Sequence, residues 1–390
     1  MQGTWIYSQE ALIMFILGVN ISHHPSIALV EDGELIYYME DDRYNGIKEE
    51  EWLPGNIMRC LMDIVRYTRH LDHITFSSYG KINGIHTYDY PDEDIIQDVK
   101  DNLGRYGITF GDSHYYWEHH LYHACNAFYA SGFDQAAALV LDGGGHYFND
   151  YITLRESESM YRFSGGEVEL VKQVYTPQGD CFKTQSKPVV VDDKYVLSAT
   201  ASCGWIFNSI MQITGFSSAG KLMGISPYGD ADKACTKDWF VYDESSDTWV
   251  TDNQTILNSY RRCYDDPTLD PAEYYTPEFD FDLIANLTKK AQDETRKHTI
   301  RLIRSLLEKV ETKNVVLSGG YFLNCVNNYE YAKEFPHINF YIDPIAHDGG
   351  TAAGAAMYLW HHVLNNSQPT QDLPVWQEKE SLTYNQSVLA

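Results

Sequence analysis

The chain has 390 residues, with 55 acidic and 29 basic side chains, and its formal net charge is −26. This length predicts two or three domains, or two lobes that share one core, and a composition that is 44% hydrophobic and 22% charged is typical of a folded chain. The acidic balance argues against binding of a nucleic-acid polymer, which needs a basic surface. A free nucleotide held by loop backbone is compatible with this charge.

Seven scattered cysteines without a CxxC pair predict reduced thiols in a cytoplasmic protein. The first apolar stretch, Ala11 to Val19, is too short to span a bilayer, and no Lys or Arg precedes Arg43 as a signal peptide would require. We therefore expect no membrane association. Residues 1–14 are expected to be an N-terminal extension, with Met14 as a candidate natural start.

The first predicted unit is a strand, a turn and a hairpin over residues 15–39. Its architecture recurs over residues 136–174, where an apolar strand runs into Asp142 and three glycines. Two such copies are expected of an α/β, two-lobed, actin-like ATPase fold (ASKHA, duplicated RNase H-like), with the ligand between the lobes. The predicted parts are a first lobe at 15–133, a second lobe with insertions at 134–365, and a tail at 366–390.

The other expected elements follow from hydrophobic spacing. Residues 84–113 are polar and predict a surface excursion, and 217–224 predicts a loop. Helices are predicted at 55–68, 118–131, 197–215, 281–311, from Leu323 and at 349–361, with strands at 72–77, 151–155, 167–174, 313–317 and 338–342.

A candidate metal site begins with His119 and His123, which are four residues apart on a predicted helix and therefore face the same way. Asp142 and Asp348 each follow a strand, so their carboxylates could complete a site of two nitrogens and two oxygens. Such a ligand set suits iron, manganese or zinc. The alternative interpretation is a polar helix face that is rich in histidine.

Three glycine-rich turns follow apolar strands and could hold phosphate through backbone amides. They are Asp142–Gly145, Ser318–Gly320 and Asp348–Gly350. The sequence has no Walker A motif and no dinucleotide-type GxGxxG. Together the turns favour a nucleotide cleft. By themselves, His23 and Lys48 indicate only an ordinary turn histidine and a solvated charge.

A set of ordered motifs resembles the carbamoyltransferases typified by nodulation protein U and the antibiotic O-carbamoyltransferases. The similarity covers roughly residues 15–360. The motifs are Gly18-x4-His23-x2-Ser26-x-Ala28-Leu29, Asp32-Gly33-Glu34-Leu35, Arg43-x4-Lys48, His119-His120-x2-His123-Ala124, Leu141-Asp142-Gly143, Gly220-Lys221-Leu222-Met223-Gly224-Ile225-Ser226-Pro227-Tyr228-Gly229, Leu317-Ser318-Gly319-Gly320-x2-Leu323-Asn324-Cys325 and Asp348-Gly349-Gly350-x3-Gly354-Ala355-Ala356.

The resemblance implies a threonylcarbamoyl-transferase-like domain that moves a carbamoyl group from carbamoyl-adenylate, made from carbamoyl phosphate and ATP, to a small-molecule hydroxyl. Sugars, antibiotics and hydroxymethylated nucleotides are possible acceptors. It implies Fe²⁺ as the ion, His23 beside the acceptor hydroxyl and Lys48 beside the carbamoyl-adenylate. The implied metal ligands are His119, His123, Asp142 and Asp348, and the implied adenylate contacts are Asp142, Gly143, Gly144, Lys221, Gly319, Gly320 and Asn324.

The sequence departs from the family pattern in two places. The usual His-Asp-Ala-Ser is His23-His24-Pro25-Ser26 here, and the family's C-terminal YrdC-like adenylating domain is not in this sequence. A separate YrdC-like protein is therefore an expected partner, and a homodimer is a further expectation. Two alternative functions are threonylcarbamoyl transfer to tRNA, which the acidic charge disfavours, and a non-catalytic nucleotide-binding scaffold. Specificity for the acceptor is expected in segments 84–113 and 236–280.

Overall fold

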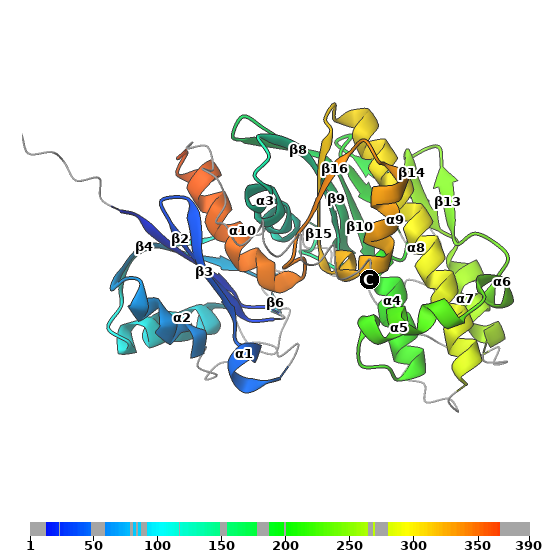
Figure 1. The fold of residues 1–390 in the computed structure, drawn as a ribbon, viewed down its shortest axis with the longest axis horizontal. Coiled ribbons are helices and arrows are strands. Elements are labelled where there is room, and N and C mark those ends of the chain that lie inside the picture. The colour runs from blue at the N-terminus through cyan, green and yellow to red at the C-terminus, as the bar shows by residue number, and fades with distance from the viewer. Residues whose placement is uncertain are drawn as a thin grey trace, which may run out of the picture.

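The protein is seen in a computed structural model that describes residues 13–22, 24–47, 59–78, 81–82, 85–86, 92–116, 118–148, 154–177, 187–198, 200–263, 268–269 and 280–366. Two mixed β-sheets lie side by side, with helices between them and on their outer faces (Figure 1). Among the described residues, no helix combines the length and the apolar character that crossing a bilayer requires.

The two sheets repeat the same strand order and the same strand directions. The first is ordered β3-β2-β1-β4-β7. Strand β2 is antiparallel to both of its neighbours, β1 and β3, whereas β4 and β7 run parallel to β1. The second contains β10-β9-β8-β15-β16 with the matching directions, and β12 and β11 extend it beyond β10. The predicted duplication is therefore confirmed. The strands are β1 Phe15–Asn20, β2 Ser26–Glu31, β3 Glu34–Glu40, β4 His70–Ser77, β7 Thr109–Tyr115, β8 Gln135–Leu141, β9 Leu154–Ser164, β10 Glu167–Pro177, β11 Val189–Val191, β12 Tyr195–Leu197, β15 Asn314–Ser318 and β16 Asn339–Ile342.

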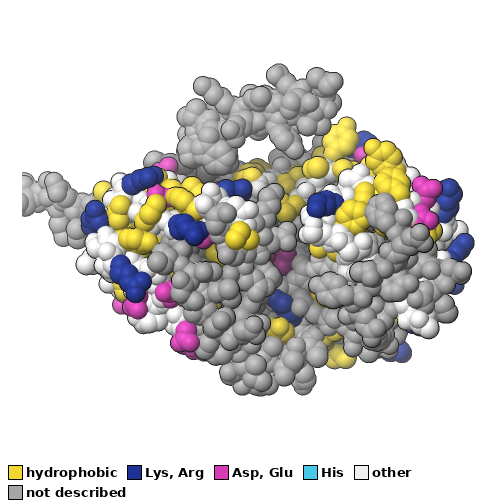
Figure 2. Space-filling model, turned by 90° about the horizontal axis from the view of Figure 1, so that it is seen from below, with side chains coloured by type: hydrophobic (Ala, Val, Ile, Leu, Met, Phe, Trp, Pro, Cys, Tyr) yellow, Lys and Arg dark blue, Asp and Glu magenta, His cyan; other side chains and the backbone are white. Residues whose placement is uncertain are grey.

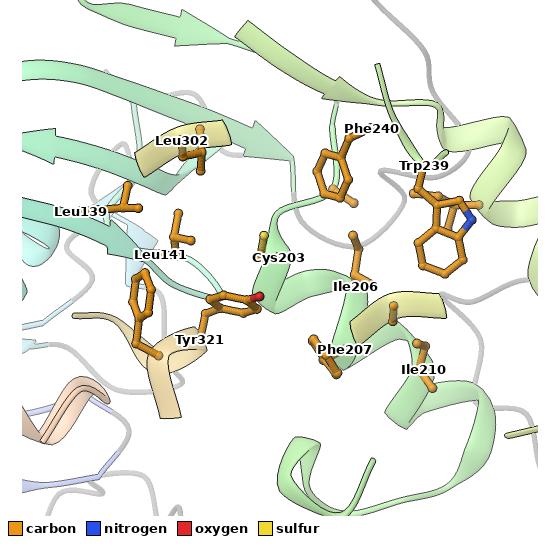
Figure 3. Packing of buried hydrophobic residues seen from close by; sticks show 14 of the residues in the cluster. Leu139, Leu141, Cys203, Ile206, Phe207, Ile210, Trp239, Phe240, Leu302 and Tyr321 are labelled. Atoms are coloured by element: carbon orange, nitrogen blue, oxygen red, sulfur yellow. The ribbon is translucent and has the colours of Figure 1, made fainter. Parts of the chain in front are cut away.

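Helices α3 (His119–Ser131) and α10 (Thr351–Tyr358) lie between the two sheets (Figure 1). Strand β8 is apolar from Ala136 to Leu141 because both of its faces are covered there. Ala136, Ala138 and Val140 pack in the same core as α3, and the alternate residues pack on the other side against α4 (Cys203–Thr214) and α8 (Phe281–Lys309). Figure 3 shows this second core, with Leu139 and Leu141 facing the side chains of α4.

The smaller elements complete the two lobes. They are the strand pairs β5 Lys81–Ile82 with β6 Ile85–His86 and β13 Phe240–Asp243 with β14 Thr248–Thr251, the helices α1 Asp42–Asn45, α2 Asp92–Arg105, α5 Ala219–Ile225, α6 Ala231–Ala234, α7 Asn253–Cys263 and α9 Cys325–Glu334, the 3₁₀ turns η1 Arg59–Arg66, η3 Ser226–Tyr228, η4 Gly320–Leu323 and η5 Asp348–Gly350, and the π-helical turn Leu359–Val363.

Helix α10 packs unusually closely against its neighbours. A Cβ atom added to Gly354 would lie 1.8 Å from the carbonyl oxygen of Tyr122 in α3, and one added to Gly18 in β1 would lie 2.0 Å from that of Ala352. These approaches need glycine. They hold α3, α10 and the first sheet together as one packed unit.

The predicted surface excursion over 84–113 is wrong, because the described part of it forms strand β6, helix α2 and most of strand β7. Ile95, Val99 and Leu103 recur every four residues and are fully buried, although acidic residues between them dilute the pattern. Strand β7 is at the edge of the sheet and keeps few apolar residues.

Several boundaries also differ from the predictions. Residues predicted as the loop 217–224 mostly form α5, which Ser218 caps by accepting from the Gly220 amide. Helix α4 begins at Cys203 rather than at 197, because Ser202 caps it. The described part of the predicted helix 55–68 is the 3₁₀ turn η1, where Cys60 with Asp63 and Leu61 with Ile64 are buried three residues apart.

Candidate metal centre and adjoining cavity

Four side chains that the sequence singles out meet at one buried point. Ligand atoms of His119, His123, Asp142 and Asp348 all lie within 4.8 Å of one another. The Nε2 atoms of the two imidazoles are 3.3 Å apart. The Oδ1 atom of Asp348 lies 3.8 Å from His119 Nε2 and 3.7 Å from His123 Nε2, and Asp142 Oδ2 lies 3.8 Å from His119 Nε2.

Local structure positions each of these groups. The first turn of α3 carries both histidines on one face. The Asp142 carboxylate accepts from the backbone amides of Gly320 (3.0 Å) and Gly144 (3.3 Å), so the two glycine turns hold this side chain in place. Asp348 begins the turn η5, where its carbonyl oxygen accepts from the Thr351 hydroxyl at 2.6 Å.

The charges within this cluster stabilise one another. Burial alone would raise the pKa of Asp142, but His119 and the other nearby imidazoles hold it well below its usual range. Burial alone would lower the pKa of His123, but Asp348 and Asp142 outweigh it and raise that pKa. The carboxylates and the His123 imidazole therefore favour one another's charged forms.

These residues fit a divalent cation. Two imidazoles and two carboxylates are the donor set of iron, manganese and zinc sites. The Nε2 atoms of both imidazoles face the carboxylates at 3.7 to 3.8 Å, which is longer than a hydrogen bond and leaves space for an ion between the ligand atoms. The structure thus brings together all four predicted ligands in an arrangement that can hold a metal ion.

A cavity of about 380 Å³ opens beside this cluster. Five of the predicted site residues line it, namely Asp142, Gly143, Gly144, Gly320 and Asp348. The remainder of the lining consists of His24, Arg155, Gly204, Trp205, Phe207, Asn208, Ala219, Met223, Tyr321, Leu323 and His347. The cavity therefore combines the cluster carboxylates with aromatic surface and with the start of α4.

Three predicted adenylate contacts do not line this cavity. Gly319 has φ +97°, and a Cβ there would lie 2.2 Å from the Leu141 carbonyl oxygen. Backbone packing therefore accounts for a glycine at this position. Asn324 is buried and caps α9 by accepting from the Asn327 amide. Lys221 is exposed, and its Nζ donates to the Ser217 hydroxyl at 2.8 Å. Nucleotide contacts by these three residues stay predictions.

The two predicted acceptor-side residues, His23 and Lys48, lie outside the described residues. Their neighbour His24 lines the cavity, and its ring centroid lies 4.5 Å from that of His347. The place of His23 beside the acceptor hydroxyl, which the family resemblance implies, stays a prediction.

Sequence reasoning missed a carboxylate–imidazole contact that joins residues from opposite ends of the chain at this cavity. His347 Nε2 lies 3.2 Å from Glu40 Oε1 at the end of β3, and His347 Nδ1 accepts from the Gly349 amide. Burial alone would raise the pKa of Glu40, but His347, Tyr38 and Arg43 outweigh it and lower the pKa to about 2. Because His347 directly precedes the predicted ligand Asp348 in the sequence, His347 could have been predicted to lie near the site.

Arg155 was missed as well. It is the sole Lys or Arg among the residues that line the cavity within the described part of the chain. Its guanidinium donates to the carbonyl oxygens of Gly145 (2.7 Å) and Gly144 (2.6 Å). No sequence motif marks it, because its place depends on its pairing with Thr176 of β10 and on its bridge to Tyr147.

Comparison with known proteins identifies a family. The sequence matches the family model "Carbamoyltransferase N-terminus" over residues 85–357, which is more than half of the chain. It is 25% identical to the nodulation protein NolNO of Sinorhizobium fredii, over 90% of this chain and 48% of NolNO, and 24% identical to the uncharacterized protein sll1178 of Synechocystis, over 90% of this chain and 58% of that protein. The chain spans about half the length of these curated relatives.

The crystal structure of HypF from T. kodakarensis matches 91% of this chain and 49% of HypF, with a TM-score of 0.55 and 12% identity. Similarity at this level of identity concerns the fold alone. It agrees with the two repeated sheets, and the two-lobed actin-like fold that the sequence predicts is confirmed.

Proposed function

Since the chain belongs to the carbamoyltransferase N-terminal domain family, we propose that it transfers a carbamoyl group from carbamoyl-adenylate to a hydroxyl of a small-molecule acceptor. One observation carries the proposal beyond the family: Asp142 and Asp348 belong both to the buried four-ligand cluster and to the wall of the cavity. A donor in this cavity would have its reacting end beside the cluster.

The cavity offers separate surfaces for the parts of an adenylate. The amides of Gly144 and Gly320 are already used by Asp142, so the phosphate is better served by Arg155 and by the N-terminus of α4. Helix N-termini bind anions through their amides and dipole. Trp205 and Tyr321 supply aromatic surface for the base.

The proposed step forms one bond and breaks one. The acceptor oxygen attacks the carbamoyl carbon, the bond from that carbon to the phosphate oxygen breaks, and AMP leaves while the hydroxyl proton is removed. We assign proton removal to His23, because the adjoining His24 lines the cavity. Bound by His119, His123, Asp142 and Asp348, a divalent cation, iron by family resemblance, would supply positive charge that stabilises the leaving phosphate.

The surface supports a small acceptor over a nucleic-acid polymer. On the face in Figure 2, the described Lys and Arg side chains are scattered and form no continuous stripe. A polymer would need such a stripe to neutralise its phosphates. We further propose that a separate YrdC-like protein makes the carbamoyl-adenylate from carbamoyl phosphate and ATP.

The test is incubation of the protein with synthetic carbamoyl-adenylate and a panel of sugars, aminoglycosides and nucleosides, followed by mass spectrometry. We expect one acceptor class to gain one carbamoyl unit. The double variant His119→Ala/His123→Ala should abolish this gain, whereas His70→Ala, an exposed histidine of β4, should leave it unchanged.

Two outcomes would contradict the proposal. Binding of carbamoyl-adenylate without transfer to any alcohol would favour the nucleotide-binding scaffold. Transfer that survives in the double variant with unchanged metal content would remove the cluster from the reaction.

A further inference from the structure

A second group of metal-binding side chains lies on the opposite face of the second sheet. Ligand atoms of Glu158, Cys203 and His298 lie within 4.8 Å of one another. Their exposures are 7%, 1% and 0%, respectively. None of the three belongs to the cluster of His119, His123, Asp142 and Asp348 or lines the cavity beside it.

A β-bulge in β9 brings Glu158 to this face. Val174 pairs with Glu158 and Tyr175 with Glu156, so Ser157 is an extra residue in the strand. Glu156 lies toward α3, where its Oε2 accepts from the His120 amide, while Glu158 contacts His298 of α8. Without the bulge, the two glutamates would share one face of the sheet.

Helices α4 and α8 supply the other two side chains. Cys203 is the first residue of α4, and Figure 3 shows it among the core side chains between Leu141 and Phe240. The His298 ring stacks on that of Phe240, with centroids 4.1 Å apart and an interplanar angle of 7°. A sulfur, an imidazole and a carboxylate therefore converge from three elements that packing holds in place.

The described contacts leave part of this group unsatisfied. His298 Nε2 is 2.6 Å from Glu158 Oε1, but His298 Nδ1 is buried with no hydrogen-bond partner among the described residues. A buried polar atom without a partner costs about 1–3 kcal/mol. A cation between the three side chains would use ligand capacity that the protein atoms do not fill.

A second cavity, of about 240 Å³, provides access from the surface. Glu158 lines it together with Lys172, Trp249, Arg301 and Glu308. A metal at the cluster could reach its ligands through this cavity and keep a water molecule as a fourth ligand, as three-ligand zinc sites do.

We propose that Glu158, Cys203 and His298 bind a second divalent metal ion, and that their mixed sulfur, nitrogen and oxygen ligands select zinc. Binding forms a metal–thiolate bond and releases the thiol proton of Cys203 to solvent, with no change of oxidation state. The ion fixes the start of α4 to β9 and α8. Because a Cβ at Gly204 would lie only 2.8 Å from Gly143, this anchor also holds the wall of the nucleotide cavity.

Cobalt substitution distinguishes this site from the first. The cluster of His119, His123, Asp142 and Asp348 contains no sulfur, so a thiolate-to-cobalt charge-transfer band in the near ultraviolet can only report a cysteine site. We expect this band in the cobalt-loaded full chain, and two metal ions per chain in elemental analysis. Cys203→Ser should remove the band and one ion, whereas His119→Ala/His123→Ala should remove one ion and keep the band.

The matched control is Cys125→Ser, another fully buried cysteine, which lies in α3. It should keep both ions and the band. His298→Gln retains the thiol and should weaken zinc binding by at least about tenfold. Absence of the band from the cobalt-loaded wild-type chain would overturn the proposal even if every variant failed to fold, and so would a band that persists in Cys203→Ser.

Discussion

The two sheets share one strand order, yet the corresponding strands β1 and β8 differ in charge at their ends. Strand β1 ends at Asn20, a neutral amide that accepts from the Ser22 amide and hydroxyl and donates to the His24 carbonyl. Strand β8 is followed by Asp142, whose charge is held by two glycine amides and faces two histidines. The Asn20 side chain bonds to residues of its own turn, whereas the Asp142 carboxylate lines the cavity.

The next strand of each sheet, β4 or β15, also differs in the residue that follows its end. Strands β4 and β15 both end in serine, at Ser77 and Ser318, but the next residue is Ser78 in the first lobe and Gly319 in the second. Only Gly319 of these two has a positive φ, because it passes close to the Leu141 carbonyl. The repeat of the strand order thus does not extend to the strand ends: of the four ends compared, only that of β8 is followed by a charged residue.

Exchanging the charge at the two strand ends should have the largest effect. We expect Asp142→Asn to weaken metal binding by more than about a hundredfold and to abolish transfer, since it removes a ligand charge. The matched variant Asn20→Asp should retain the metal and lose about 1–3 kcal/mol of stability, because a carboxylate would face the His24 carbonyl. Elemental analysis and urea unfolding check both, and equal metal content in the two variants would refute the asymmetry.

The glycine after β15 should matter more than an equally strained glycine elsewhere. Gly319→Ala should cost about 3–5 kcal/mol in the free energy of unfolding, because the Cβ meets the Leu141 backbone. Gly166→Ala has a similar positive φ but nothing within 4 Å, so only the backbone penalty of about 1–2 kcal/mol is expected. Similar costs in the two urea titrations would show that the close approach is not required.

The contact between lobes should make stability depend on acid. The folded-state pKa of Glu40 is depressed to about 2 from 4.5, so its contribution is complete above pH 5 and is lost as pH falls toward 2. This contribution is at most about 3 kcal/mol. Glu40→Gln should lose less stability between pH 6 and pH 3 than the wild type does, and Glu34→Gln, exposed on β3, should follow the wild type. Parallel pH profiles for all three proteins would argue against the pair.

The smallest expected effect is on AMP affinity, and it distinguishes two basic side chains of the second lobe. Arg155→Ala should weaken AMP binding by about tenfold, the size of one charge-assisted contact. Lys221→Ala should change it by less than about twofold, since exposed cations contribute little. Calorimetry with AMP measures both, and a larger loss for Lys221→Ala would support the nucleotide contact that the family resemblance implies.

Most of the candidate metal cluster was predictable because it is built from local rules. Helical spacing places His119 beside His123, and the end of β8 places Asp142, whereas Asp348 lies beyond the end of β16, in the turn η5. Both signals are short-range and survive without knowledge of tertiary contacts. The same holds for β8, whose uninterrupted apolar run predicts a strand covered on both faces.

Other parts of the fold depend on information that single residues do not carry. The bulge at Ser157 turns Glu156 and Glu158 to opposite faces, and a sequence pattern of alternating glutamate and serine does not reveal it. The pair of Glu40 and His347 joins residues from opposite ends of the chain. Helix α2 was missed because acidic side chains on its outer face masked three buried positions.

The close packing of α10 against α3 ties together most of the candidate metal ligands. His119 and His123 lie on α3, Asp348 directly precedes α10, and Gly354 lets the two helices touch at the Tyr122 carbonyl. Three of the four candidate ligands therefore lie on, or directly before, two helices whose backbones touch. A substitution that separates α3 from α10, such as Gly354→Val, is expected to disturb the candidate metal cluster as well as the packing of the two sheets.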